Sequence, residues 1–305
     1  MSGDQEQGGA TPRTVIDPGT GRPVLLAPRR QARPNNTSQA TDGICPFCPG
    51  NEKQTPPEAD AVRMAGTAKD SPGWRVRAFP NLYPATEHHE VVAEGDAHST
   101  LPHELDANLW ADAIALYQRR MAALEARAGV RTACWFKNVG AAAGASMAHN
   151  HSQILGLPFV PPRLELELAQ TRARGSCLWC DELRSAEAAG RIVRAEPEYV
   201  LFVPTVPKLP NETWLVPRQH GTDLLRADPK ALGTSLHMLF RAVFGAFGPV
   251  AFNVWLHRIP GIDFHWHFEL QPRTGQVAGF ELGGDMYINS VAPETSARRL
   301  RSALS

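Results

Sequence analysis

Two segments of the chain carry the same residue types in the same order. The first consists of Cys45-Pro-Phe-Cys48, then His98, then His149-Asn-His-Ser-Gln153; the second consists of Cys177-Leu-Trp-Cys180, then His220, then His265-Trp-His-Phe-Glu269. Four of the five cysteines therefore fall in two C-x-x-C pairs, each followed by a distant His and an H-x-H. The repeat predicts a duplicated scaffold with two metal sites.

Zinc is the metal that this pattern favours. Two Cys and two His form a tetrahedral zinc site, in which a C-x-x-C turn supplies both sulfurs and the other ligands come from elsewhere in the fold. Spacing alone does not separate His98 from its neighbours His88 and His89, and the alternative interpretation is two pairs of buried cysteines beside core histidines. Cys134 is expected in the core. The two predicted zinc sites are Cys45, Cys48, His98 and His149, and Cys177, Cys180, His220 and His265.

Bulk properties exclude several classes of protein. The 305 residues are long enough for two domains, and 43% hydrophobic with 20% charged residues is typical of a globular chain. No apolar run approaches the roughly 18 residues of a membrane span. The polar first twelve residues are expected to be a flexible tail rather than an export signal, which predicts a cytoplasmic protein. With 31 basic and 31 acidic residues, the chain is not expected to bind nucleic acid by bulk charge.

The order of expected elements repeats as well, which predicts a duplicated α+β unit with an antiparallel sheet and flanking helices. We place the halves at residues 13–160 and 161–305, with residues 158–175 between them. Strands are expected at 75–79, 90–94, 132–137 and 149–155 in the first half, and at 199–203, 212–216, 250–256 and 264–270 in the second. Helices are expected at 103–128, 163–174 and 230–247, and a turn at 17–23 divides the first ordered stretch, 14–28.

Several stretches are similar to one known family. They are Ala27-Pro-Arg-Arg-Gln-Ala-Arg-Pro34, Cys45-Pro-Phe-Cys-Pro-Gly-Asn-Glu52, Thr55-Pro-Pro-Glu58, Phe79-Pro-Asn-Leu-Tyr-Pro84, His98-Ser99, Asn138-Val-Gly-Ala-Ala-Ala-Gly-Ala-Ser146, His149-Asn-His-Ser-Gln153 and Gly279-Phe-Glu-Leu-Gly-Gly-Asp-Met-Tyr-Ile-Asn289. Together they resemble the galactose-1-phosphate uridylyltransferase family of the histidine triad superfamily. The second C-x-x-C is similar to that of its ADP-glucose phosphorylase-like branch. The resemblance implies histidine-triad-like halves, a homodimer and a role in galactose or other carbohydrate metabolism.

The resemblance also implies roles for individual residues. His151 is the expected nucleophile, because a neutral imidazole can attack the α-phosphorus of a nucleoside diphosphate sugar and form a nucleotidyl-histidine. Gln153 and Ser146 are expected to bond the phosphoryl oxygens as charge develops there. Zinc on His149 is expected to be structural and to fix the strand that carries His151. Further expected substrate contacts are Arg30, Arg33, Asn81, Asn138, Gly140 and Gly144.

The second half departs from this pattern. Glu269 stands where the first half has Gln153, and a carboxylate repels a phosphate anion, so His267 is not expected to be catalytic. The family has Pro between the two active-site histidines, whereas this chain has Asn150, which weakens the match to hexose-1-phosphate uridylyl transfer in particular. Glu167 lies where some uridylyltransferases have a ligand of a second metal, and we interpret it as an ordinary helix residue.

The leading hypothesis is a nucleotidyltransferase that passes a nucleotide from a nucleoside diphosphate sugar to a hexose-1-phosphate. An ADP-sugar phosphorylase with inorganic phosphate as acceptor would use the same intermediate, and water is a third possible acceptor. The alternative from another class is a non-catalytic, zinc-stabilised nucleotide-binding module. The base, the sugar and the acceptor stay open at this point.

Overall fold

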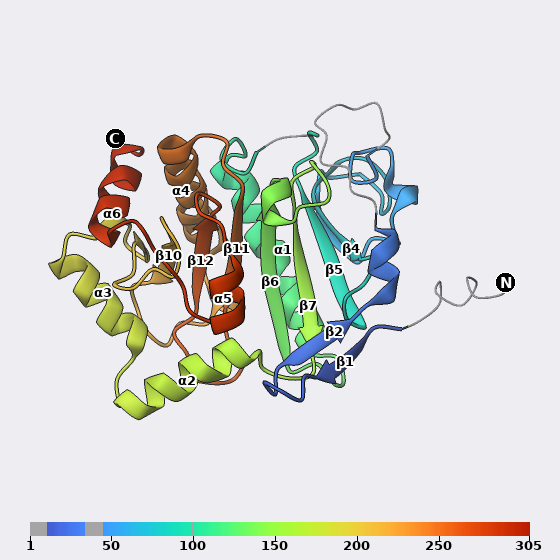
Figure 1. Ribbon diagram of the computed structural model, residues 1–305. Coiled ribbons are helices and arrows are strands. Elements are labelled where there is room, and N and C mark those ends of the chain that lie inside the picture. The colour runs from blue at the N-terminus through green and yellow to red at the C-terminus, as the bar shows by residue number, and fades with distance from the viewer. Residues whose placement is uncertain (1–10, 34–44, 99–100) are drawn as a thin grey trace.

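The computed structural model describes residues 11–33, 45–98 and 101–305. The expected tail at residues 1–12 lies almost entirely outside these ranges. Ten strands form one antiparallel sheet, and a separate hairpin, β1 (Arg13–Ile16) with β2 (Pro23–Leu26), lies in front of it (Figure 1). In spatial order the ten strands are β3 (Asp60–Arg63), β4 (Trp74–Pro80), β5 (His88–Glu94), β7 (His151–Leu157), β6 (Thr132–Val139), β11 (Phe252–His257), β12 (His267–Pro272), β10 (Thr213–Pro217), β9 (Tyr199–Phe202) and β8 (Ile192–Ala195).

The strand order shows the duplication. Reading outward from the central pair β6 and β11, the first half continues with β7, β5, β4 and β3, and the second half with β12, β10, β9 and β8. The two halves meet edge to edge, with Phe252 opposite Val139 and Trp255 opposite Phe136. The predicted α+β class with a duplicated antiparallel sheet and flanking helices is confirmed.

Two long helices cover the rear face of the sheet and bury its apolar side chains. These are α1 (Ala107–Glu125) and α4 (Pro229–Phe247), and the Trp110 and Phe240 rings lie 4.8 Å apart between them. The helices approach closely because position 233 is Gly; a Cβ there would lie 2.5 Å from the backbone nitrogen of Ala111. The remaining helices are α2 (Pro162–Arg174), α3 (Leu178–Ala188), α5 (Gly279–Gly284) and α6 (Pro293–Ser302).

Some predicted boundaries were wrong. Helix α1 begins at Ala107 rather than 103, because the Asp106 carboxylate accepts from the Leu109 N–H and caps it. The strands predicted at 149 and 264 begin only at His151 and His267, so that the first His of each H-x-H precedes its strand. Helices α3, α5 and α6 and strands β3 and β8 were not predicted; for the strands, four edge residues give little periodic signal.

A buried ion pair lies between α1 and the sheet. Lys137 and Glu94 are fully buried, the Lys137 ammonium pairs with the Glu94 carboxylate, and Tyr117 donates its hydroxyl hydrogen to the same carboxylate. Lys137 also donates to the backbone carbonyl of His151 at 2.9 Å. The pair therefore fixes the start of β7 from behind.

Replacing Lys137 with Met should lower the free energy of unfolding by about 3–5 kcal/mol, because Glu94 would be left as an unpaired buried charge. Urea unfolding measures this change. The double variant K137M/E94Q should recover more than about 1 kcal/mol of the loss, since the amide keeps an acceptor for Tyr117 without a charge. A loss below about 1 kcal/mol for K137M alone would contradict this role.

Candidate active site and metal sites

The first Cys/His cluster joins three distant parts of the chain. Cys45, Cys48, His98 and His149 each offer a ligand atom, and these atoms lie within 4.8 Å of one another. The Cys48 Sγ is 3.4 Å from His98 Nδ1 and 3.5 Å from His149 Nδ1. The other nitrogen of His149, Nε2, lies 3.0 Å from the carbonyl oxygen of Gly95, which fixes the ring with Nδ1 toward the sulfurs. His88 and His89 lie outside this cluster.

The second cluster repeats this geometry. Cys177, Cys180, His220 and His265 also offer ligand atoms within 4.8 Å of one another. His265 Nδ1 is 3.5 Å from both sulfurs, and its Nε2 is 2.8 Å from the carbonyl oxygen of Pro217. His220 Nε2 is 2.7 Å from a carboxylate oxygen of Asp263, which orients that ring as well. Each cluster could hold a metal ion with two sulfur and two nitrogen ligands.

His151 is the first residue of strand β7. Its Nδ1 lies 2.8 Å from the carbonyl oxygen of His149, so the N–H is at Nδ1 and the lone pair is at Nε2. Burial lowers the pKa of His151 to about 4, although the hydrogen bond from Nδ1 opposes the shift. The ring is therefore neutral near pH 7, and its Nε2 could act as a nucleophile without losing a proton.

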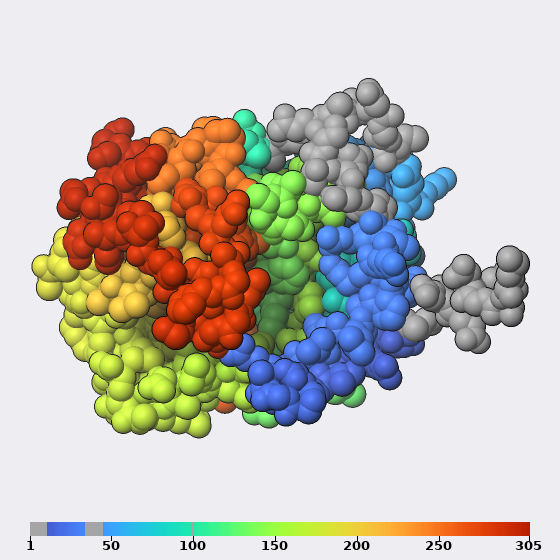
Figure 2. Space-filling view, in the orientation of Figure 1, coloured from blue at the N-terminus to red at the C-terminus, as the bar shows by residue number. Residues whose placement is uncertain are grey.

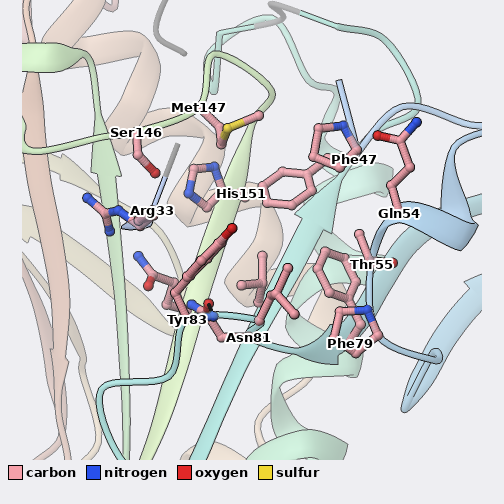
Figure 3. A pocket seen from close by; sticks show the side chains of 15 residues that line it. Arg33, Phe47, Gln54, Thr55, Phe79, Asn81, Tyr83, Ser146, Met147 and His151 are labelled. Carbon is pink, nitrogen blue, oxygen red and sulfur yellow. Dashed lines mark hydrogen bonds between the residues drawn. The ribbon is translucent and has the colours of Figure 1, made fainter. Parts of the chain in front are cut away.

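His151 faces a pocket of about 330 Å³ in front of β4, β5 and β7 (Figure 3). Of the residues expected to bind substrate, Arg33, Asn81, Ser146 and Gln153 line this pocket. Figure 3 places Ser146 and Arg33 on one side of the His151 ring, Phe47 on the other and Met147 above it. The lining also includes residues that were not expected to bind substrate, although several of them lie in the stretches that carry the resemblance: Pro46, Phe47, Gln54, Thr55, Pro56, Phe79, Leu82, Tyr83, Val91 and Met147.

Four residues expected to bind substrate lie outside the pocket lining. Arg30 donates to the backbone carbonyl of Tyr83 at 3.1 Å and so supports the pocket wall. Asn138 accepts from the Asn253 side chain at 2.7 Å, which connects the turn to the second half. Gly140 and Gly144 both have φ of +81° in this turn, and a Cβ on Gly140 would lie 2.8 Å from that of Ala251. These glycines shape the loop that carries Ser146.

In the second half, the residue equivalent to His151 is blocked. His267 begins β12 as His151 begins β7, and its Nδ1 also lies near a backbone carbonyl, that of His265, at 3.1 Å. Its Nε2, however, accepts a hydrogen bond from the indole N–H of Trp179 at 3.0 Å. Trp179 occupies the position of Phe47 between the cysteines, and the Trp214 ring also lies near His267, with centroids 5.3 Å apart. Within the described ranges no donor contacts Nε2 of His151, whereas Trp179 donates to Nε2 of His267.

Glu167 is not the ordinary helix residue that we expected. It is largely buried, and its carboxylate lies 3.0 Å from His257 Nδ1, while His267 Nε2 is 3.5 Å from the carboxylate of Glu269. Glu167, His257 and His267 form a third group whose ligand atoms lie within 4.8 Å. The helical pattern of residues 163–174 gives no sign of this, because the partners come from β11 and β12.

Taken together, the described residues define a class of protein: a duplicated antiparallel fold with two Cys/His clusters, in which His151 of the first half faces a pocket and its counterpart His267 is blocked by Trp179. No family model matches the chain. It is 28% identical to ADP-glucose phosphorylase of Arabidopsis thaliana, over 95% of this chain and 93% of the relative. It is 26% identical to galactose-1-phosphate uridylyltransferase of Thermotoga maritima, over 91% of this chain and 94% of the relative.

Solved structures agree with these relatives. A crystal structure of an Arabidopsis thaliana ADP-glucose phosphorylase with bound ADP-glucose covers 96% of this chain and 98% of its own, with a TM-score of 0.75 and 28% identity. A uridylyltransferase structure covers 95% of this chain and 98% of its own, with a TM-score of 0.79 and 27% identity. The predicted resemblance to the galactose-1-phosphate uridylyltransferase family, with its ADP-glucose phosphorylase-like branch, is confirmed over nearly the whole chain.

The variant F47W tests whether the free lone pair makes His151 reactive. An indole N–H at position 47 should donate to His151 Nε2 as Trp179 does to His267, and a hydrogen bond of about 1.4 kcal/mol corresponds to about a tenfold slower attack. The measurement is the rate at which diethyl pyrocarbonate acylates His151, followed by peptide mass mapping. The matched variant W179F should leave that rate unchanged. Equal rates for F47W and the wild type would contradict the assignment.

Proposed function

We propose that the chain is a nucleotidyltransferase that acts on a nucleoside diphosphate sugar through a covalent nucleotidyl-histidine at His151. The observation that carries the proposal is the His151 ring itself: Nδ1 bonded to the His149 carbonyl, Nε2 facing the pocket, and a pKa lowered to about 4 by burial. The relatives support the same class of chemistry, since they are named as a phosphorylase of ADP-glucose and as uridylyltransferases.

The reaction proceeds in two displacements. Nε2 of His151 attacks the α-phosphorus, the bond from that phosphorus to the bridging oxygen breaks, and sugar-1-phosphate leaves with the electron pair. A phosphate oxygen of the acceptor then attacks the same phosphorus and releases His151 in its original state. Both displacements use a neutral imidazole, so no proton has to leave His151 before the attack.

Neighbouring side chains stabilise the negative charge on the transferred phosphoryl group. Gln153 and Ser146 line the pocket beside His151 and can donate hydrogen bonds to the non-bridging oxygens. Arg33 lines the same pocket, and its guanidinium keeps its positive charge through both displacements. These three residues stabilise the transition state more than the ground state when their hydrogen bonds to the non-bridging oxygens form only as the phosphorus becomes five-coordinate.

The acceptor distinguishes two versions of this activity. A hexose-1-phosphate acceptor corresponds to the uridylyltransferase relatives, and inorganic phosphate corresponds to the ADP-glucose phosphorylase relative. The second Cys/His cluster and Asn150 favour the phosphorylase as a second candidate. The two acceptors share the attacking group, a phosphate oxygen, so the same nucleotidyl-His151 serves either one.

Zinc is the proposed occupant of both Cys/His clusters, because two thiolates and two imidazoles are its typical ligands. Its role is structural. In the first cluster His149 is one ligand and its backbone carbonyl accepts from His151, so the metal would hold the nucleophile in one tautomer and one orientation.

A homodimer in the cytoplasm completes the proposal. Residues 279–289 carry five exposed large apolar side chains, Phe280, Leu282, Met286, Tyr287 and Ile288. In Figure 2 this orange-red segment and the blue hairpin β1–β2 border a hollow in front of the central strands, and Asp285 pairs with Arg22 at the hairpin tip. None of the described helices is long and apolar enough to cross a membrane. In a dimer, this segment could reach the partner's site.

The experiment that tests the function compares acceptors and a nucleophile variant. With ADP-glucose or UDP-glucose as donor, the wild type should form a nucleoside diphosphate from inorganic phosphate or a new nucleotide sugar from hexose-1-phosphate. The variant H151N should lose at least about 10³-fold in either transfer, because the covalent route is removed. Retained turnover in folded, metal-loaded H151N would contradict the mechanism.

Metal content should follow the two clusters. Mass spectrometry of the metals should find two zinc ions per wild-type chain, and one in each of the variants C45S and C177S. Burial raises the pKa of Cys48 and of Cys177, so both thiols should release protons when zinc binds the apoprotein. Loss of both ions from either single variant, or fewer than two ions in the wild type, would argue against two independent sites.

A further inference from the structure

His89 has no role in the account so far, yet it contacts Gln153 directly. The two residues lie on neighbouring strands, β5 and β7, and both side chains are buried. His89 Nε2 is 3.0 Å from the Gln153 Oε1. On the opposite side of the ring, the backbone N–H of Ala85 donates to His89 Nδ1 at 2.9 Å.

The contact with Ala85 determines where the His89 proton is. A neutral imidazole carries one N–H, and a nitrogen that accepts a hydrogen bond from a backbone amide cannot carry it. Nδ1 is that acceptor, so the proton is on Nε2, and Nε2 donates to the Gln153 oxygen. Burial, together with the positive charge of Arg30, lowers the pKa of His89 to about 3, so this neutral form persists near pH 7.

The neighbouring amide of Asn81 agrees with this assignment. Its Oδ1 accepts from the Tyr83 backbone N–H at 2.8 Å, so its NH₂ group is the part that lies 3.2 Å from His89 Nε2. An NH₂ group cannot donate to a nitrogen that already carries a proton. Gln153 is therefore the acceptor for His89, which leaves the amide hydrogens of Asn81 available to the pocket that it lines.

The orientation of Gln153 follows from its oxygen. With Oε1 toward His89, the amide NH₂ of Gln153 is directed away from His89, and the side chain lines the pocket with His151. An amide flipped by 180° would present an oxygen to the pocket, and that oxygen would repel a phosphoryl oxygen. His89 thus selects the amide rotamer that can donate.

In the second half, two carboxylates occupy the positions of His89 and Gln153. Gln153 is opposite Val91 in the sheet, and Glu269 is opposite Trp214, so Glu212 occupies the place of His89 and Glu269 that of Gln153. Lys208 lies 2.7 Å from Glu269 and 3.1 Å from Glu212, so that one ammonium pairs with both carboxylates. Neither position can donate to an anion there, and Trp179 blocks His267 in the same half.

We propose that His89 is a positioning residue, whose Nε2–H holds the Gln153 amide with its NH₂ group toward the phosphoryl oxygens of the bound nucleotide. The proposal rests on the function proposed above, and it adds a requirement for the donor: a non-bridging oxygen of the α-phosphate must lie beside Gln153 during transfer. The proposal requires the neutral His89 ring with its proton on Nε2, and it assigns no role to a positive charge on that ring.

The test compares two amide replacements of His89, Gln and Asn. Gln can place its NH₂ group where His has Nε2, whereas Asn is too short to do so. In single-turnover reactions with ADP-glucose and with UDP-glucose, intact-protein mass spectrometry measures the rate of nucleotidylation. H89N should be slower by about 100-fold, comparable with the loss of one oxyanion donor, and H89Q should stay within about fivefold of the wild type. H88N, on the opposite face of β5, is the matched control and should leave the rate unchanged.

A double-variant cycle separates positioning from a general structural effect. If His89 acts only through Gln153, then H89N should cost about 100-fold in the wild-type background and less than about threefold in the Q153A background. An equal cost in both backgrounds in variants that retain the wild-type metal content, or equal rates for H89N and the wild type, would overturn the proposal.

A second measurement does not depend on turnover. Long-range ¹⁵N–¹H spectra of ¹⁵N-histidine-labelled protein, with H89Q used for assignment, report the tautomer of His89. The proposal expects a proton on Nε2 and none on Nδ1 between pH 6 and 8. A proton on Nδ1, or on both nitrogens, would overturn it. If the wild type forms no nucleotidyl adduct, the proposed function fails, while the spectra still decide the orientation of the His89–Gln153 pair.

Discussion

The position of one residue, His149, determines the rest of the site. Its side chain joins the first Cys/His cluster through Nδ1 and bonds Gly95 through Nε2, so the ring is held on both sides. Its backbone carbonyl then accepts from His151 Nδ1. The tautomer of the proposed nucleophile is thus set by the backbone of a proposed metal ligand. From the rear, Lys137 holds the His151 carbonyl, so the start of β7 is fixed from both faces of the sheet.

Duplication explains the architecture, and small differences between the halves explain where chemistry can occur. Both halves have a C-x-x-C, an H-x-H at the start of a central strand, and a helix behind the sheet. Trp179 stands in the second half where Phe47 stands in the first, so the ring beside His267 donates a hydrogen bond to it, whereas the ring beside His151 is apolar. Gln153 is replaced by Glu269, whose carboxylate pairs with Lys208. The second half therefore retains a cluster that could bind metal and offers no open nucleophile.

Much of this could be predicted from the sequence, because the chemistry depends on residue types at short spacings. The C-x-x-C and H-x-H motifs predict both clusters, the family resemblance predicts the role of His151, and runs of β-branched and aromatic residues predict the central strands. The sequence could not show that Trp179 donates to His267, since 88 positions separate them. Nor could it show the His89–Gln153 contact, which depends on the register of β5 against β7. Glu167 was misjudged for the same reason: its partners lie on strands far along the chain.

The most direct measurement is the mass of the intact protein after incubation with ADP-glucose and, separately, with UDP-glucose, without an acceptor. The account predicts that one of the two donors adds a single nucleotidyl group per chain, that peptide mapping places it on His151, and that sugar-1-phosphate is released in equal amount. The identity of that donor names the base. A protein with its metal in place that gains no mass from either donor, or that carries the group on a residue other than His151, would contradict the account.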